Sequence, residues 1–177
     1  IERALEWAAC GGFDNINIDL IHGYFGQGIG DALADIDKAI ACGVQHISTY
    51  QLTIEKKTIF GHRIQKGAQL LDSESTLLDM FHGIRKHLLA RGYPPYELCS
   101  ASLPRYRSQH GLGYWTGRDY LALGAGGHGF YRRASGGAVR WGNERSPERY
   151  MESALAGQLV DEFHETSNER ELHEELL

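Results

Sequence analysis

The sequence has few cysteines, and the few that it has are far apart. Cys10, Cys42 and Cys99 are odd in number and widely separated along the chain. A disulfide framework needs paired cysteines, and a clustered metal site needs short spacings between its ligands. We therefore expect three free, buried thiols.

Long apolar runs and blocks of like charge are also missing. No stretch approaches the roughly 20 apolar residues that span a bilayer, and the charged segment 1–10 (IERALEWAAC) does not resemble a signal peptide. The net charge of −5 is spread along the chain, without a stripe of lysine and arginine. We therefore expect a cytoplasmic protein without a nucleic-acid partner.

What the sequence does contain is an alternation of strand and helix patterns. A length of 177 residues and a hydrophobic content of 42% fit one compact domain. The first half is predicted to hold a helix over 1–10, a strand over 15–21, a helix that ends at Gly43 and a strand over 46–52. A strand, a helix and a strand in this order form a βαβ unit with parallel strands, which predicts an α/β fold.

The second half combines helix patterns with a glycine-rich segment. Nine glycines fall among the 27 residues from Gly111 to Gly137, which predicts loops. The predicted elements are a helix from Asp72 or Ser73 to Gly92, strands over 96–99 and 120–123, a helix from Ser146 to Gly157, and a last helix opened by a capping box of Thr166 and Glu169.

Asp19 and Gln51 lie toward the ends of the two predicted parallel strands. Ligands of parallel α/β folds bind at the carboxyl ends of the strands, and an ionised carboxylate accepts hydrogen bonds from both hydroxyls of a ribose. Asp19 is therefore a candidate nucleoside ligand, with a loop cap or an ion pair as the alternative. A metal site of Asp19, His22 and His46 is disfavoured, because His22 follows one strand whereas His46 begins the other.

The segment GAGGHG (124–129) matches the glycine spacing of a nucleotide-binding loop. No helix pattern follows it, so the match is weak. Close approach of the backbone to a flat group, with His128 projecting from the loop, is the better interpretation. A tight turn without a ligand is the alternative.

The segment HGLGYW (110–115) places an imidazole next to two large aromatic rings. His110 can ligate a haem iron while Tyr114 and Trp115 cover the porphyrin, and Cys99 is another conceivable ligand. A packed turn is the alternative. Three arginines could meet haem propionates, with a solvated surface as the other interpretation: Arg132, Arg133 and Arg140.

Five stretches, taken in order, resemble one protein family. They are NINIDLIHGYFGQ, HISTYQLTIEKKTIFG, GYPPYELCSAS, QHGLGYWTGRDYLALGAGGHGF and RRASGGAVRWGN. Together they are similar to the coproporphyrinogen III oxidase-like radical SAM family, and most similar to its haem chaperone branch. The resemblance implies that residues 1–95 are the last strands of a partial (β/α)₆ TIM-like barrel and that residues 96–177 begin a small α+β C-terminal region.

The resemblance also implies cofactors and ligands. Family members hold a 4Fe-4S cluster on a C-x-x-x-C-x-x-C loop, and the cluster binds S-adenosylmethionine. This chain has no such loop, so we expect it to be inactive alone, with no catalytic residue and no cluster ligand of its own. By the resemblance, Asp19 and, more weakly, Gln51 bind S-adenosylmethionine, whereas His110, Tyr114 and Trp115 bind haem.

Three functions are consistent with these features. The first is a fragment of a haem chaperone that transfers haem to an acceptor protein, with membrane contact only through that acceptor. The second is an oxygen-independent coproporphyrinogen III oxidase, and the third is a non-catalytic remnant. The chain departs from the family pattern at Ser100, at Gly111, at Gly127 and in the GYFGQ turn, which affects how tightly ligands bind.

Overall fold

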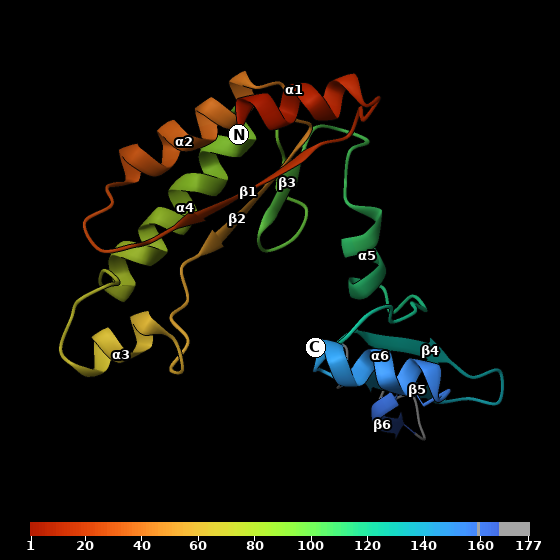
Figure 1. Cartoon of the computed structure of the whole chain (residues 1–177). Helices are drawn as coiled ribbons and strands as arrows, with labels where there is room; N and C mark the ends of the chain where they lie inside the picture. Colours follow the sequence, from red (N-terminus) through yellow and green to blue (C-terminus); the bar gives the residue numbers. More distant parts are fainter. Residues whose placement is uncertain (159, 167–177) are drawn as a thin grey trace. The chain divides into compact units, whose positions relative to one another are not determined.

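The computed structural model describes residues 1–158 and 160–166, with side chains described as far as residue 158. The chain forms two compact units, one from Ile1 to Ser108 and one that begins at Gln109 (Figure 1). The expectation of one compact domain was wrong, because each unit has a three-stranded sheet of its own.

The first unit is built around a mixed sheet with the strand order β1-β2-β3. β1 and β2 run parallel, and β3 is antiparallel to β2 (Figure 1). The elements of this unit are α1 (Glu2–Cys10), β1 (Asn17–His22), α2 (Ile29–Ala41), β2 (His46–Gln51), α3 (Ile59–Gln65), α4 (Glu74–Ala90) and β3 (Ser100–Ser102). The predicted βαβ unit with parallel strands is confirmed.

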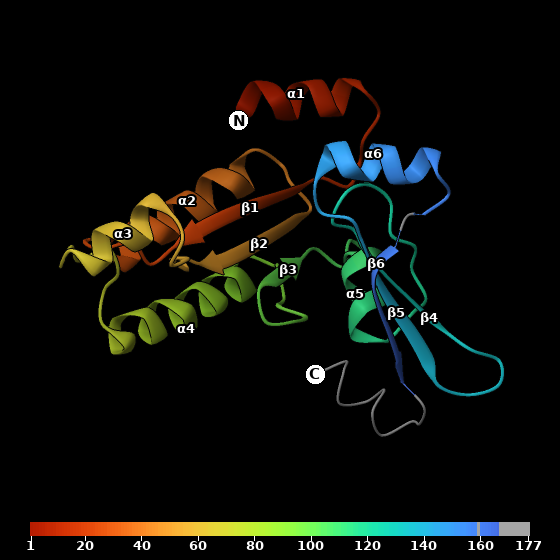
Figure 2. The ribbon, with the colours of Figure 1, turned by 60° about the horizontal axis from the view of Figure 1, so that its bottom comes forward.

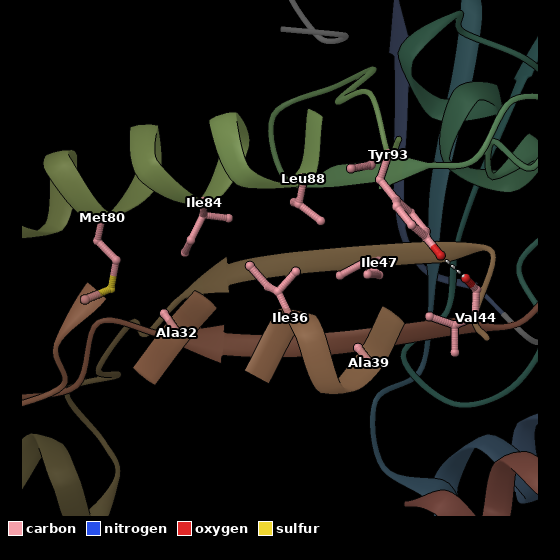
Figure 3. Close-up of a cluster of buried hydrophobic side chains, with 10 residues drawn as sticks. Ala32, Ile36, Ala39, Val44, Ile47, Met80, Ile84, Leu88 and Tyr93 are labelled. Atoms are coloured by element: carbon pink, nitrogen blue, oxygen red, sulfur yellow. Dashed lines mark hydrogen bonds between the residues drawn. The ribbon is translucent and has the colours of Figure 1, made fainter. Parts of the chain in front are cut away.

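Two helices, α2 and α4, form the core of this unit with one face of the sheet. Ile36 of α2, Ile84 of α4 and Ile47 of β2 are buried, and Figure 3 shows their side chains pointing into a common cluster. The Tyr93 hydroxyl closes one end of the cluster by donating a 2.6 Å hydrogen bond to the Val44 carbonyl oxygen. The other face of the sheet is left for polar side chains.

Local capping explains the helices of this unit. Ser73 caps α4 through its side-chain oxygen, which accepts a hydrogen bond from the Thr76 amide, so the predicted helix start is confirmed. The helix α3 was not predicted from the sequence. It begins after Thr58, because the Thr58 side chain accepts a hydrogen bond from the Gly61 amide.

The predicted strand over 96–99 was wrong, since β3 begins at Ser100. The guanidinium of Arg85 donates hydrogen bonds of 2.9 Å to the carbonyl oxygens of Glu97 and Leu98. These carbonyls point at a helix instead of a neighbouring strand, so this segment bends before the chain pairs with β2.

The second unit has an antiparallel sheet with the order β4-β5-β6 (Figure 2). Its elements are α5 (Gln109–Trp115), β4 (His128–Arg132), β5 (Ala138–Asn143), α6 (Pro147–Leu155) and β6 (Val160–Thr166). The helix opened by Ser146 and Pro147 is confirmed, because the Ser146 side chain accepts from the Arg149 amide. The helix predicted after Thr166 lies outside the described residues.

Three predictions for the glycine-rich segment were wrong. HGLGYW is helical and forms most of α5, and the segment predicted as loops contains β4, which forms a hairpin with β5 directly after the segment. The predicted strand over 120–123 is reduced to a single bridge between Tyr120 and Phe130. Packing of these aromatic side chains outweighs the low helix propensity of Gly111 and Gly113.

The glycine-rich turn before β4 is held by the protein itself. The Asn143 side-chain amide donates a 3.0 Å hydrogen bond to the Gly124 carbonyl oxygen, and the Asn143 backbone amide donates to the Gly127 carbonyl oxygen at 2.8 Å. Gly129 follows this turn, and a Cβ atom there would overlap the indole of Trp141. The flat group that the backbone approaches is therefore a tryptophan of this chain.

Replacing Gly129 by alanine will destabilise the second unit by about 1–3 kcal/mol, the usual cost of overpacking a filled site. Urea unfolding followed by tryptophan fluorescence measures the loss. Gly113→Ala is the control, because its added Cβ lies 3.8 Å from the nearest atoms, in Arg118, and alanine favours a helix by up to about 1 kcal/mol. Equal stabilities for Gly129→Ala and the wild type would contradict this packing.

Candidate functional site

A hydrogen-bonded polar network lies on the sheet face that α2 and α4 do not cover. Asn17 on β1 is its centre: its Nδ2 is 2.7 Å from Asp19 Oδ1, and its Oδ1 is 2.6 Å from His46 Nδ1 and 3.1 Å from Ser48 Oγ. The strand register explains this arrangement, because Asn17 pairs with His46 and Asp19 with Ser48. Side chains of paired residues in neighbouring strands lie on the same face.

Tyr96 extends the network from the bend before β3. Its hydroxyl lies 2.7 Å from His46 Nε2 and accepts a 3.1 Å hydrogen bond from the Ser108 amide. The guanidinium of Arg107 packs over the Tyr96 ring at 5.3 Å. Sequence reasoning missed Tyr96, which is 50 residues from His46 along the chain.

His46 is a buried imidazole within this network, with 4% of its surface exposed. Burial lowers the pKa of His46 from the usual 6.5, and the carboxylates of Glu97 and Asp19 oppose that shift. The imidazole is therefore neutral near pH 7, with one nitrogen as donor and the other as acceptor.

Asp19 is exposed, and it is the third residue of β1 instead of the last. The expectation that it lies at the strand end was therefore wrong. One oxygen, Oδ1, is occupied by Asn17. In the described part of the chain no hydrogen bond reaches the other oxygen, Oδ2, which is available to a ligand.

Gln51 does not join Asp19. It pairs with His22 across the parallel strands, whereas Asp19 pairs with Ser48. Since successive side chains of a strand point to opposite faces, Gln51 lies on the face opposite to Asp19. One ligand lying on either face cannot contact both side chains.

His22, at the end of β1, is buried and neutral. Its Nδ1 has no hydrogen-bond partner among the described residues, and burial lowers its pKa from the usual 6.5. His46 is at the opposite end of the strand pair, about 16 Å away for five residues of rise. His22 and His46 therefore cannot share a metal ion with Asp19, and the described residues contain no cluster of three or more metal-ligating side chains.

The cysteines are free, but the prediction that all are buried was wrong. Cys10 and Cys42 are exposed, and Cys99 is half-buried. Burial, together with the Glu97 carboxylate, raises the pKa of the Cys99 thiol, whereas Arg85 opposes that shift. Cys99 is therefore protonated near pH 7 and is a poor metal ligand.

A second candidate site lies on α5 in the second unit. His110 and Tyr114 are four residues apart, on one helix face, with ring centroids 4.8 Å apart at an interplanar angle of 88°. Tyr114 packs edge-on against Tyr120 at 4.6 Å, and Tyr120 stacks on the buried Phe130 at 6.0 Å. This row of rings fixes the exposed imidazole of His110 to the sheet.

Trp115 is exposed on another side of α5. At 100° per residue it lies about 140° around the helix from His110, whereas Tyr114 lies about 40° from it. A cavity of about 140 Å³ adjoins His110 and Tyr114, and Arg118 is part of its wall. The structure thus brings His110 and Tyr114 together, but not Trp115.

Two of the arginines proposed for propionates are engaged within the protein. Arg132 Nε lies 3.5 Å from Asp119 Oδ1, and the Arg140 guanidinium packs over the Phe130 ring at 5.7 Å. These contacts tie the sheet to the aromatic row. Tyr120 and Asp119, which sequence reasoning missed, were identifiable only once the β4–β5 hairpin was known.

No family model matches the chain. The haem chaperone HemW of Escherichia coli K12 is 36% identical over 151 residues, that of Buchnera aphidicola subsp. Acyrthosiphon pisum 35% over 162 residues and that of Bacillus subtilis 31% over 176 residues. These alignments cover 85%, 91% and 99% of this chain. The chain is a homologue of the HemW haem chaperones.

The chain spans about two fifths of the HemW proteins that it matches, namely 39%, 41% and 44% of their lengths. Its structure is similar to part of HemN, the coproporphyrinogen III oxidase of Escherichia coli, a radical SAM enzyme. The TM-score is 0.70 with 17% identity, over 92% of this chain and 39% of HemN. This likeness shows the fold, and the predicted α/β fold class is confirmed.

Within the described residues, no helix is long and apolar enough to cross a bilayer.

We expect the free energy of unfolding to fall as the pH is lowered from 7 to 5. Burial holds the pKa of His22 and of His46 below 6.5, so protons bind the unfolded chain more tightly than the folded one. The stability present above pH 6.5 is lost below it. Urea unfolding at several pH values measures how steeply the free energy of unfolding depends on pH. This dependence will be shallower in His22→Leu. It will be unchanged in the control His62→Gln, because His62 is exposed. An unchanged slope in His22→Leu would contradict this assignment.

Proposed function

We propose that this chain is part of a HemW-type haem chaperone, which binds haem on α5 and passes it to an acceptor protein. The observation that carries the proposal is the His110–Tyr114 pair, an exposed imidazole held at 88° to a tyrosine ring. An imidazole nitrogen can ligate haem iron, and an aromatic ring packs well against a porphyrin. The identity to HemW chaperones over most of this chain supports it.

The size of the cavity limits how haem lies. At about 140 Å³ it is smaller than the ligand pockets of roughly 300 Å³ and more that enclose drug-sized molecules. The macrocycle therefore lies against the exposed surface of α5 beside His110 and Tyr114, and only a side arm enters the cavity. Arg118 can pair with a propionate there, since Asp119 is already occupied by Arg132.

A nucleoside site on the uncovered sheet face is the second part of the proposal. Asp19 Oδ2 would accept hydrogen bonds from the ribose of S-adenosylmethionine. Ile21 and Tyr50, which are 62% and 42% exposed, lie two residues further along their strands on the same face and offer apolar surface to the base. Gln51 is left out, because it lies on the other face.

The residues of this chain do not fit the cluster. The described cysteines lie at the end of α1, at the end of α2 and before β3, and form no metal-ligating group. The ligands of a 4Fe-4S cluster would lie outside this chain. When bound, the cluster supplies the electron that cleaves S-adenosylmethionine, whereas Asp19 only binds and orients the nucleoside.

The first unit would be the last part of a partial (β/α)₆ barrel. Parallel strands with helices on one face support this, and β1 is the edge strand of the described sheet. The boundary expected at residue 95 moves to Ser108, because β3 pairs with β2. The second unit would be the start of the C-terminal region.

A coproporphyrinogen III oxidase is the alternative, favoured by the similarity to the HemN fold. Incubating the complete protein and its cluster with coproporphyrinogen III under anaerobic conditions separates the two. Formation of a product with vinyl groups supports the oxidase, whereas haem transfer to an acceptor without turnover supports the chaperone. A protein that binds neither haem nor S-adenosylmethionine would be a non-catalytic remnant.

We expect haemin to bind this chain in a saturable 1:1 complex. His110→Ala should weaken binding about tenfold or more, because loss of an axial ligand lowers the binding free energy by over about 1.4 kcal/mol. The Soret band followed during titration measures the affinity. Trp115→Ala will have a smaller effect, because Trp115 lies on another side of α5.

His128→Ala is the matched control for this titration, since His128 is a second exposed histidine of the same unit. Circular dichroism establishes that each variant is folded. Equal Soret shifts for the wild type and His110→Ala, or loss of the band only in His128→Ala, would rule out the proposed site.

A further inference from the structure

The polar network on the uncovered sheet face has a single consistent direction of donors and acceptors. Asp19 is a carboxylate that can only accept, so the Asn17 amide NH₂ must donate to it. Asn17 Oδ1 then accepts from Ser48 Oγ and from His46 Nδ1, which must carry the proton. His46 Nε2 is therefore the acceptor, and the Tyr96 hydroxyl donates to it.

This order leaves the Asn17 side chain only one orientation. A flipped amide would present its NH₂ to the protonated His46 Nδ1 and its oxygen to the Asp19 carboxylate, so that donors would face donors and acceptors would face acceptors. The mismatch at His46 leaves a buried donor unsatisfied, which is costlier than an unsatisfied group exposed to water. The Asp19 carboxylate, the Ser48 hydroxyl and the buried His46 imidazole thus all require the same orientation of Asn17.

The orientation of Asn17 in turn decides how Asp19 is presented. Asp19 is exposed, and its one hydrogen-bond partner in the described residues is Asn17, through Oδ1 at 2.7 Å. That one bond fixes the rotation of the carboxylate and keeps Oδ2 free on the uncovered face. A side chain that is held before a ligand arrives loses less conformational entropy on binding.

We propose that His46 is a positioning residue: through Asn17 it holds the Asp19 carboxylate in the orientation that accepts a vicinal diol, such as that of a ribonucleoside. The proposal rests on the nucleoside site proposed above. It adds that diol recognition depends on a histidine that does not touch the ligand, and on the Tyr96 hydroxyl that donates to that histidine.

A merely structural role for His46 would give different results. Filling the sheet face requires a ring of the right size, so His46→Phe would then preserve ligand recognition. Positioning requires a donor at Nδ1 and an acceptor at Nε2. His46→Gln retains one donor and one acceptor in its side-chain amide, so it is the conservative variant expected to restore part of the effect.

The decisive experiment compares two probes on the complete protein: adenosine and 2′,3′-dideoxyadenosine, which lacks the diol. Isothermal titration gives the ratio of their dissociation constants. We expect the wild type to bind adenosine clearly more tightly than 2′,3′-dideoxyadenosine. In His46→Phe this preference should be about fivefold smaller, because one oriented hydrogen bond is lost. His46→Gln should have an intermediate preference. His87→Gln, at a histidine bonded to Asp37 at 2.9 Å between α4 and α2, is the control and will match the wild type.

The outcomes separate the two proposals. If the wild type binds both probes equally, the nucleoside site at Asp19 is wrong and this inference fails with it. If the wild type prefers adenosine and His46→Phe retains the full preference, the site stands and the positioning role is overturned.

Two further measurements remain decisive if His46→Phe does not fold. Tyr96→Phe keeps its ring and removes only the hydroxyl, and it should reduce the preference for adenosine about twofold. Nitrogen-15 NMR of the wild type should show the His46 proton on Nδ1. A proton on Nε2 would overturn the inference without any variant.

Discussion

The register of the two parallel strands β1 and β2 determines most of what the first unit can do. Asn17 pairs with His46, and His22 pairs with Gln51 at the other end. Because side chains alternate between faces, this register turns Ile18 and Ile47 toward the helices and leaves the other face to the polar network around Asn17. A shift by one residue would bury these polar groups under α2 and α4.

The sequence predicted which residues of β1 lie on the polar face of the sheet, but not which residues contact them there. The alternation in NINIDLI predicted Asp19 opposite the core, because a strand has a period of two. Gln51 was predicted to share a ligand with Asp19 because both lie toward the ends of predicted strands and by the family resemblance, yet only the register shows that they lie on opposite faces. Tyr96 could not be found from the sequence, as a bend held by Arg85 brings it to His46.

The α5 segment shows how tertiary packing overrides local pattern. Two glycines in HGLGYW predicted a loop, whereas contacts of Tyr114 with Tyr120, and of Tyr120 with Phe130, stabilise a short helix. Helical spacing places His110 and Tyr114 on the same face of α5 and Trp115 on another face. The residue types of the proposed haem site were evident in the sequence, but their grouping required the hairpin of β4 and β5.

The exposed His110–Tyr114 pair is the basis of the proposal that haem binds on the surface of α5, and the similarity to HemW chaperones supports haem as the ligand. Ferric haem is paramagnetic and broadens the NMR signals of nearby amides. Titrating haemin into nitrogen-15-labelled protein should broaden the amides of Gln109 to Trp115 first and those of Tyr120 next. Broadening centred in the first unit, or spread evenly over the chain, would contradict the account.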